Sequence, residues 1–120
     1  MTKKTLVLGG SLKSERYSNK AIRQLVAYGF PVVSIGLKTG KVGEVSIQTG
    51  MPDFTEIHTV TIYLNPQNQV PYYDYLLGLS PKRIVFNPGT ENNVLVQLCT
   101  DAGIIVVEDC TLVMLNMRNY

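Results

Sequence analysis

Short apolar runs alternate along the chain with polar segments of helical length. Most of these runs are rich in Val, Ile and Leu and lack a regular alternation with polar residues. That composition is typical of strands whose two faces are both covered by helices, as in a parallel sheet. The third run differs, because Thr59 and Thr61 alternate with apolar residues and favour an edge position. The five predicted strands lie at residues 5–8, 32–35, 59–64, 83–86 and 104–107.

Three of the polar segments carry apolar side chains at the spacing of one helix face. Residues 19–28 precede Gly29, and residues 91–102 precede Gly103. Glycine is the commonest residue just beyond the end of a helix, so both segments have a clear stop. Residues 71–79 form the third predicted helix, with a proline at its start.

The segment 38–55 has no such period, because glycines and a proline interrupt it throughout. These residues are Gly40, Gly43, Gly50 and Pro52. We expect an irregular crossover there, with at most a short strand near residues 45–47.

The alternation of strands and helices predicts an α/β fold: a Rossmann-like doubly wound sheet of five mainly parallel strands, with helices on both faces. Right-handed crossovers give 3-2-1-4-5 as the simplest order of the predicted strands. The chain has 120 residues, 45% of them hydrophobic and 17% charged, which corresponds to one folded domain over residues 1–120. Ligands of such folds bind beyond the carboxyl ends of the strands, so the loops after the strands are where a site is expected.

Composition excludes several classes of partner and site. A net charge of +2 is too small for a duplex-binding surface, so we expect no nucleic-acid partner. Cys99 and Cys110, with His58 as the single histidine, match neither a zinc site nor a disulfide framework, and we expect no metal. No apolar run approaches the roughly 20 residues that cross a bilayer, and the first run is too short for a signal peptide. These features predict a cytoplasmic protein without membrane contact.

The loop after the first predicted strand has the features of a phosphate-binding turn. Gly-Gly-Ser at 9–11 follows the strand, and Ser18 and Asn19 open the predicted helix. Backbone N–H groups and the positive helix end then face one small volume, where the guanidinium of Arg16 would suit phosphate oxygens. The alternative is a tight turn followed by an ordinary serine N-cap, and the GxGxxG dinucleotide fingerprint is missing.

The end of the second predicted strand bears on which nucleotide would bind. NAD-binding domains usually place an Asp or Glu there to hold the ribose hydroxyls, whereas this chain has Gly36 and Leu37 followed by Lys38. A lysine favours a ribose that carries a phosphate, as in coenzyme A (CoA) or NADP. Lys38 and Lys41 are the candidates for that contact, and the alternative is that both are solvated loop lysines.

Two proline turns of similar composition follow the next strands. Asn-Pro-Gln at 65–67 follows the third predicted strand, and Asn-Pro-Gly at 87–89 follows the fourth. Both lie on the predicted binding edge, where their amides could contact polar groups of a ligand. The alternative is that these residues serve turn chemistry alone.

The sequence contains no recognisable catalytic constellation. His58 is at the start of the third predicted strand, at the edge away from the predicted ligand, and no motif places a Ser or Cys beside it. Cys110 follows the fifth predicted strand and is either a ligand contact or a structural thiol, while Cys99 fits a core position in a helix. A non-catalytic protein is therefore favoured, although the sequence does not decide the point.

Several stretches, in the same order, resemble one family over nearly all of residues 4–115. They are VLGGS with ERYSN downstream, IYLNP, FNPGTEN and AGIIVVEDCTLVML. FNPGTEN and EDCTLVML are the most specific, since neither is generic to nucleotide-binding folds. On these motifs the chain resembles the stand-alone CoA-binding domain family, small bacterial Rossmann-like proteins similar to the nucleotide domain of the succinyl-CoA synthetase alpha chain.

The resemblance implies a nucleotide pocket with CoA as its ligand. Leu12 and Ser14 stand where prolines are common in the family, and Gly36 and Leu37 replace a common Asn-Pro pair, although Lys38 remains. Gly36 and Lys38, at and just after the end of the second predicted strand, are also candidate ligand-binding residues. The residues that match the family's pocket segments are Gly9, Gly10, Ser11, Arg16, Tyr17, Ser18, Asn19, Asn65, Pro66, Pro88, Gly89, Glu91 and Asn92.

Three functions are compatible with this sequence. The first is non-catalytic binding of CoA or an acyl-CoA through the phosphate-binding turn. The second is an NADP-dependent oxidoreductase subunit, which needs a proton donor that the sequence does not identify. The third is a protein-interaction scaffold with a vestigial nucleotide pocket, and the sequence names no protein partner. A ligase reaction is least supported, because similar ligases use a phosphorylated histidine and an ATP-grasp partner, and His58 occupies no such motif.

Overall fold

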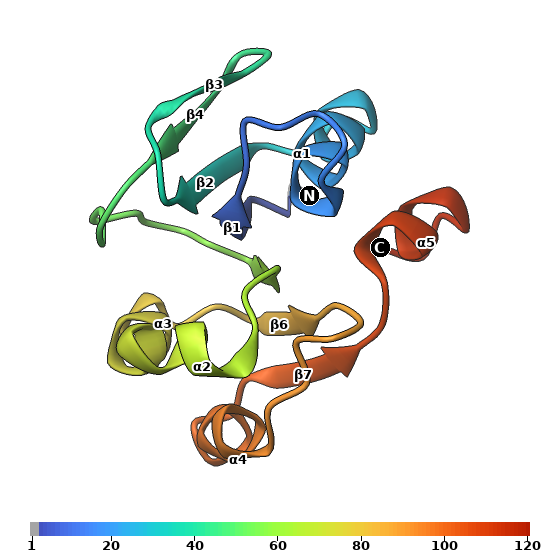
Figure 1. The fold of residues 1–120 in the computed structure, drawn as a ribbon. Helices are drawn as coiled ribbons and strands as arrows, with labels where there is room; N and C mark the ends of the chain where they lie inside the picture. The colour runs from blue at the N-terminus through green and yellow to red at the C-terminus, as the bar shows by residue number, and fades with distance from the viewer. Residues whose placement is uncertain (1–2) are drawn as a thin grey trace.

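Seven strands form one sheet in the computed structural model, which describes residues 3–120 (Figure 1). The strands are β1 (Thr5–Gly10), β2 (Val32–Gly36), β3 (Gly40–Val42), β4 (Val45–Gln48), β5 (Thr59–Ile62), β6 (Arg83–Phe86) and β7 (Ile105–Glu108). Across the sheet their order is β3-β4-β2-β1-β5-β6-β7. Neighbouring strands are parallel except β3 and β4, which form an antiparallel hairpin. The predicted α/β class with a mainly parallel sheet is confirmed.

The helices lie between the strands, as the sequence pattern predicts. They are α1 (Tyr17–Ala27), α2 (Pro66–Gln69), α3 (Tyr73–Leu79), α4 (Asn93–Asp101) and α5 (Thr111–Asn116), with a 3-10 turn η1 (Val70–Tyr72) before α3. The three predicted helices correspond to α1, to η1 with α3, and to α4. Gly29 and Gly103 stop α1 and α4, at φ of +88° and +78°.

Two short helices were not predicted. α2 follows the turn after β5, and α5 contains most of the apolar residues near the end of the chain. Met114 and Leu115 of α5 are buried, while Val113 and Met117 are exposed. This segment therefore completes the core with one side and presents apolar side chains on another.

Successive residues of β1 pack on opposite faces of the sheet. Leu6 and Leu8 lie in a buried cluster with Leu76 of α3 and Leu95 of α4. Val7 lies in a second cluster, with residues of α1 and α5. Figure 1 shows α1 and α5 on one side of the sheet and α3 and α4 on the other. The prediction of helices on both faces is confirmed.

The predicted strand order is wrong at one position. The third predicted strand, observed as β5, pairs with β1 rather than with β2, so the five predicted strands are ordered 2-1-3-4-5. The place beside β2 is taken by β4, because residues 40–48 form a hairpin instead of an irregular crossover. The chain then returns to the other side of β1. The switch point of the sheet, where ligands of open α/β folds bind, is therefore between the carboxyl ends of β1 and β5.

The hairpin explains why the segment looked irregular. β3 and β4 are joined by the two residues Gly43 and Glu44, with Val42 paired to Val45. Gly43 has φ +59°, a conformation that favours glycine at the first position of such a turn. The short strand expected near residues 45–47 is confirmed as part of β4, whereas β3 was not predicted.

β5 is a central strand and not the edge strand that its threonines indicated. Thr59 and Thr61 are both fully buried. The Thr59 hydroxyl accepts a hydrogen bond from Arg83 Nε at 2.8 Å, and the Thr61 hydroxyl accepts one from Asn87 Nδ2 at 2.7 Å. The alternation of threonine with apolar residues therefore reflects hydrogen bonding inside the protein, which satisfies hydroxyls that would be costly to bury alone.

Candidate functional site

The loop from β1 to α1 begins in a glycine turn that lets three strands approach closely. Gly9 has φ +96°, and a Cβ there would lie 3.0 Å from Cδ2 of Leu64, in the segment after β5. Gly10 is the register partner of Gly36, and a Cβ on Gly36 would overlap the carbonyl oxygen of Gly10. Gly9, Gly10 and Gly36 are therefore brought together at the carboxyl ends of β1, β2 and β5.

Side chains of α1 hold the rest of this loop. The Nδ2 of Asn19 donates to the carbonyl oxygen of Ser11 at 2.8 Å, and the Oδ1 of Asn19 accepts from Arg23 Nε at 2.8 Å. Arg23 also donates from Nη2 to the carbonyl oxygen of Ser14 at 2.9 Å. Sequence reasoning missed Arg23, whose position four residues after Asn19 on a helix was the available signal. Two carbonyl groups of the loop are thus fixed by α1.

The helix α1 begins at this loop without a side-chain cap. Its N-cap residue is Arg16 rather than Ser18, and Arg16 makes no capping hydrogen bond. Asn65 caps α2 through the N–H of Asn68, and Asn92 caps α4, whereas α3 and α5 start, like α1, without a side-chain cap. Within residues 3–120, the first turn of α1 therefore keeps backbone N–H groups without a side-chain acceptor, at the positive end of the helix. An anion placed there would receive those hydrogen bonds.

Basic side chains lie around the start of α1 and in the connection that leads from β2 into the neighbouring hairpin. Lys13, Arg16 and Lys38 are exposed. The loop and the hairpin are in contact, because Leu12 packs over Gly40 of β3, where a Cβ would lie 2.6 Å from Leu12 Cδ2. The side chain of Leu12 is what joins the two segments. The positive charges of both segments therefore belong to one region of the surface.

The residues that lead into α1 differ in accessibility. Tyr17 is 68% exposed, and the Nζ of Lys20 lies 5.2 Å from the centre of its ring. Ser18 and Asn19 are buried within the chain. Of this segment, the side chains of Arg16 and Tyr17 are open to a ligand, whereas those of Ser18 and Asn19 support the loop from inside.

A buried amide pair joins the two proline turns. The Nε2 of Gln69 donates at 2.8 Å to the carbonyl oxygens of both Leu64 and Thr90. The Nδ2 of Asn92 donates to Gln69 Oε1 at 2.9 Å and to the hydroxyl of Tyr73 at 2.8 Å. The structure thus brings the predicted residue Asn92 together with the turn that follows β5. Gln69, which the sequence analysis did not select, forms the centre of this arrangement.

A second buried amide links β5, β6 and α5. The Nδ2 of Asn87 donates to the Thr61 hydroxyl at 2.7 Å and to the carbonyl oxygen of Ile62 at 2.8 Å, and its Oδ1 accepts from the N–H of Thr111 at 2.9 Å. Asn87 is 3% exposed. It therefore fixes the carboxyl ends of two strands and the first turn of α5, and its amide is fully used inside the protein.

The outer part of the turn after β6 faces solvent. Pro88 and Gly89 are exposed. The N–H of Gly89 donates to Glu91 Oε1 at 2.9 Å, so the turn is closed by its own carboxylate. Asn65 is exposed, and Pro66 forms the first turn of α2. These residues form the rim of the carboxyl edge on the β5 and β6 side.

The hydroxyl of Tyr63 is buried directly after β5 and has no hydrogen-bond partner among residues 3–120. Burial, and then the neighbouring thiol of Cys110, raises the pKa of Tyr63 far above its ordinary value. The Cys110 side chain is half-buried at the start of α5. A neutral phenol and a thiol therefore lie beside the switch point on the α5 side of the sheet.

His58 lies immediately before β5, at the end of the sheet where the parallel strands begin and away from the candidate site, as the sequence predicts. Its Nδ1 is 2.7 Å from the hydroxyl of Thr59. Burial lowers the pKa of His58 below 6.5, and the positive charges of Arg83, Lys3 and Lys82 lower it further. Among residues 3–120, no group of three or more His, Cys, Asp and Glu side chains is arranged to hold a metal ion.

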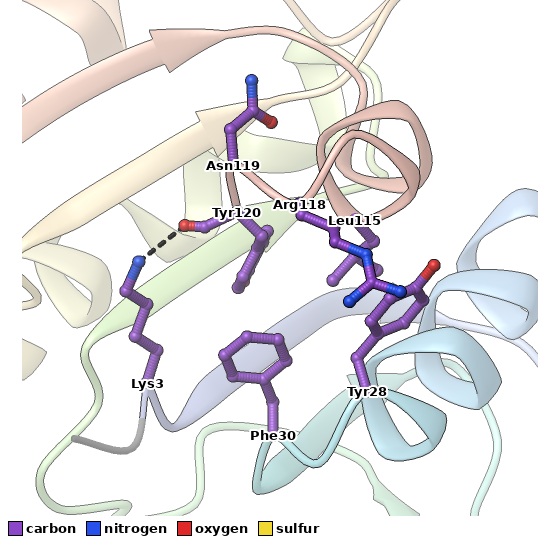
Figure 2. Close-up of a pocket in the computed structure, with 7 residues that line it drawn as sticks. All are labelled: Lys3, Tyr28, Phe30, Leu115, Arg118, Asn119 and Tyr120. Atoms are coloured by element: carbon purple, nitrogen blue, oxygen red, sulfur yellow. Dashed lines mark hydrogen bonds between the residues drawn. The ribbon is translucent and has the colours of Figure 1, made fainter.

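Two cavities also lie at this opposite edge, where the strands begin. One has a volume of about 390 Å³, and Figure 2 shows its aromatic rings and the hydrogen bond from Lys3 Nζ to the carbonyl oxygen of Tyr120. The other has a volume of about 290 Å³ and lies beside the start of β6 and β7. Neither includes a residue of the candidate set. The first is lined by Lys3, Tyr28, Phe30, Leu115, Arg118, Asn119 and Tyr120, the second by Leu77, Ser80, Pro81, Lys82, Ala102, Gly103 and Ile104.

A glycine turn, an uncapped helix start and two proline turns thus follow the carboxyl ends of β1, β5 and β6, on both sides of the switch point. The sequence profile of one known family, the CoA binding domain, matches residues 3–116 of the chain. This chain belongs to the CoA binding domain family. The match includes every residue of the candidate set, from Gly9 to Asn92. No curated protein sequence matches this CoA binding domain.

Solved structures place this CoA binding domain among close structural relatives. A crystal structure of an uncharacterized protein is 42% identical, has a TM-score of 0.96, and is matched over 100% of this chain and 99% of that one. Cell-free ID.343 from Thermus thermophilus is 20% identical with a TM-score of 0.88, over 99% of this chain and 91% of that one. The dinucleotide-forming acetyl-coenzyme A synthetase 1 of Ca. Korarchaeum cryptofilum, solved with phosphate and ADP, is 17% identical with a TM-score of 0.74. It is matched over 89% of this chain but only 25% of its own, and the last two likenesses concern the fold alone.

No helix within residues 3–120 of the CoA binding domain combines the length and the apolar character needed to span a membrane.

Proposed function

We propose that this CoA binding domain binds CoA or an acyl-CoA without catalysing a reaction on it. The observation that carries the proposal is the uncapped start of α1, which faces the glycine turn at the switch point of the sheet. Free N–H groups at a helix start favour a phosphate, and CoA contains a diphosphate. The family of the chain supports CoA as the source of that phosphate.

In the proposed binding mode the diphosphate lies against the first turn of α1. Gly9 and Gly10 let the backbone before this loop lie close to β2 and to the segment after β5, and the Ser11 hydroxyl and the Arg16 guanidinium supply further donors. A guanidinium has two parallel N–H groups that match two phosphate oxygens, which favours Arg16 for this role. Tyr17, exposed at the same helix start, is available to pack against the ligand.

Lys38 is proposed to contact the phosphate on the ribose of CoA. It is exposed in the connection between β2 and β3, two residues before Gly40, over which Leu12 of the phosphate-binding loop packs. NAD has no phosphate at this position, whereas CoA and NADP have one on the ribose. Lys38 is therefore the residue by which phosphorylated and unphosphorylated riboses are distinguished.

The two proline turns are proposed to form the other side of the pocket. Pro88, Gly89 and Asn65 are exposed there, and Pro66 starts the short helix between them. Asn92 acts as a positioning residue, because its amide is hydrogen-bonded to Gln69 and Tyr73. The role proposed for this side is to shape the pocket, with the phosphate contacts coming from the α1 side.

Calorimetric titration of the ligand-free protein with CoA, dephospho-CoA, NADPH and NADH, at one fixed salt concentration, tests this function. We expect CoA to bind most tightly and dephospho-CoA to bind about tenfold or more weakly, as for the loss of one charged hydrogen bond. Lys38→Ala should weaken CoA and leave dephospho-CoA unchanged. Lys82→Ala, an exposed lysine at the opposite edge, is the matched control and should change neither.

The other outcomes decide between the remaining functions. Preference for NADPH over CoA would replace the proposal with an oxidoreductase subunit. No binding of any of the four would replace it with a protein-interaction scaffold. Chromatography of the titrated sample would contradict the non-catalytic role if it showed consumption of CoA or release of a new product.

A further inference from the structure

The two ends of the sheet differ in how they are protected. Among residues 3–120, no strand pairs with the outer side of β3 or of β7 (Figure 1). β3 has three residues, includes the exposed Lys41, and is folded back in a hairpin. β7 has four residues, Ile-Val-Val-Glu, with no charge or proline before Glu108. Short strands, charged side chains and proline are the usual means of preventing edge pairing; β7 is short and ends in Glu108, but it has no lysine, proline or hairpin on its outer side.

The outward-facing backbone groups of β7 can be assigned from its register. Ile105 pairs with Arg83 and donates its N–H to the carbonyl oxygen of Lys82 at 3.0 Å, so Ile105 and Val107 bond inward to β6. Successive residues of a strand point their N–H and C=O groups to opposite sides. Val106 and Glu108 therefore direct theirs away from the sheet. These groups are available to a further strand.

Exposed apolar side chains surround this edge. Ile105 is 63% exposed although it lies within a strand. Val94 of α4 is also exposed, and α4 packs against β7. Apolar surface on a strand and on the helix that packs against it is typical of a contact with another protein.

Charged residues flank both ends of β7. Near its start are the exposed Asp101, at the end of α4, and the exposed Lys82, whose carbonyl oxygen accepts a hydrogen bond from the first residue of β7. Glu108 and Asp109, both exposed, are at the other end. A second β7 running in the opposite direction would place its Glu108 and Asp109 at the end of the first that holds Lys82. A second β7 running parallel would place the two acidic Glu108–Asp109 pairs together.

We propose that two copies of this chain associate through β7, antiparallel about a two-fold axis at Val106. The N–H and C=O of Val106 would exchange two hydrogen bonds with the partner's Val106, which is the closely hydrogen-bonded type of antiparallel pair. The N–H of Glu108 would donate to the partner's Ile104 carbonyl oxygen. The result is one continuous sheet with the same surface used twice, as in most two-fold dimers.

Sedimentation equilibrium at micromolar concentrations tests this association. We expect a particle of twice the chain mass. Val106→Pro removes the outward N–H but no bond to β6, so it should raise the dimer dissociation constant at least tenfold while circular dichroism still shows a folded chain. Ile105→Lys should have the same effect through a charge at the edge. Val26→Lys, an exposed apolar position on α1, is the matched control and should leave the dimer unchanged.

The charge arrangement gives a second readout. Lys82→Glu and Glu108→Lys should each weaken the dimer, and the two together should restore part of the affinity, because the pairs are re-formed with reversed signs. A monomer at all concentrations would overturn the proposal. A dimer that is insensitive to both Val106→Pro and Ile105→Lys would place the interface elsewhere and would also overturn it.

Discussion

Asn92 donates a hydrogen bond from its Nδ2 to the Oε1 of Gln69 at 2.9 Å, and this bond joins the loop after β6 to the helix α2. Gln69 is fully buried, and its own Nε2 donates to the carbonyl oxygens of Leu64 and Thr90. The pair therefore fixes the two proline turns of the candidate site relative to each other. The rigidity of this side of the site depends on two amides that lie 23 residues apart in the chain.

Replacing Asn92 should be costly for stability. Asn92→Ala leaves the buried Oε1 of Gln69 without this donor and removes the cap that accepts from the N–H groups of Val94 and Leu95. We expect the free energy of unfolding in urea to fall by about 2–4 kcal/mol, the sum of a lost cap and an unsatisfied acceptor. Asn93→Ala, at the exposed next position, should change it by less than about 0.5 kcal/mol. Equal effects of the two variants would contradict the structural role of Asn92.

Gly10 is expected to be required by Ser34 of the neighbouring strand. A Cβ at position 10 would overlap the Ser34 hydroxyl, which donates to the carbonyl oxygen of Val7 at 2.8 Å. Gly10→Ala should lower the free energy of unfolding by about 1–3 kcal/mol, the usual cost of overpacking. The double variant with Ser34→Ala should be less destabilised than the sum of the single changes, because the clashing oxygen is gone. Additive effects in urea unfolding would contradict this explanation.

Arg23 is expected to hold the loop between β1 and α1 in its conformation. Arg23→Ala removes the donors to Asn19 and to the Ser14 carbonyl oxygen. Amide hydrogen exchange followed by mass spectrometry should become faster in residues 11–16 and stay unchanged in β6. Gln24→Ala, the next and also exposed position of α1, is the control. Unchanged exchange in the loop would show that its conformation does not depend on Arg23.

His58 should make stability depend on pH just below neutrality. Burial and nearby cations lower the pKa of His58 in the folded protein below 6.5, so at mildly acidic pH the unfolded chain binds a proton that the folded chain does not. Stability should therefore fall as the pH drops below about 6.5, and level off below the folded pKa of His58. His58→Gln should reduce this fall when unfolding is measured between pH 7.5 and 5.5. The same pH profile in both proteins would exclude His58 as its source, and the sequence has no other histidine.

The two thiols should differ in reactivity in the folded protein. Burial raises the pKa of Cys99 to about 11, and its side chain is fully buried, whereas Cys110 is half-buried. Iodoacetamide at pH 8 should label Cys110 first, because the thiolate is the reactive form and must be accessible. Cys110→Ser should remove the early labelling, and unfolding in urea should make both native thiols react. Equal labelling rates in the folded protein would contradict the burial of Cys99.

Much of the fold could be predicted because its signals are local. The Val, Ile and Leu runs identify the parallel strands, and Gly29 and Gly103 mark where two helices end. The hairpin also had a local signal, Gly43 and Glu44 between two valines, which the other glycines of the segment obscured. Strand order was less accessible, since it depends on whether β5 is added beside β2 or beside β1, and the hairpin strand β4 takes the place beside β2.

The candidate site likewise has some features that the sequence reveals and others that only the folded structure reveals. The glycine turn at Gly9 and Gly10 is visible in the sequence, because close backbone approach and positive φ restrict the choice of residue. The supporting contacts of Arg23 and Gln69 are not visible in the sequence, because an amide or guanidinium can pair with many groups. Only the folded chain selects the partner.

The sequence by itself determined the alternating strands and helices, the family, and the loops that follow the strands, because each follows from the types and spacing of residues near one another in the chain. The tertiary structure alone decided that β5 lies against β1, that α1 starts without a cap while Asn65 and Asn92 cap other helices, and that β7 ends the sheet with Ile105 exposed. These features depend on which distant groups satisfy one another's hydrogen bonds and cover one another's apolar surface, and that is settled only when the whole chain packs.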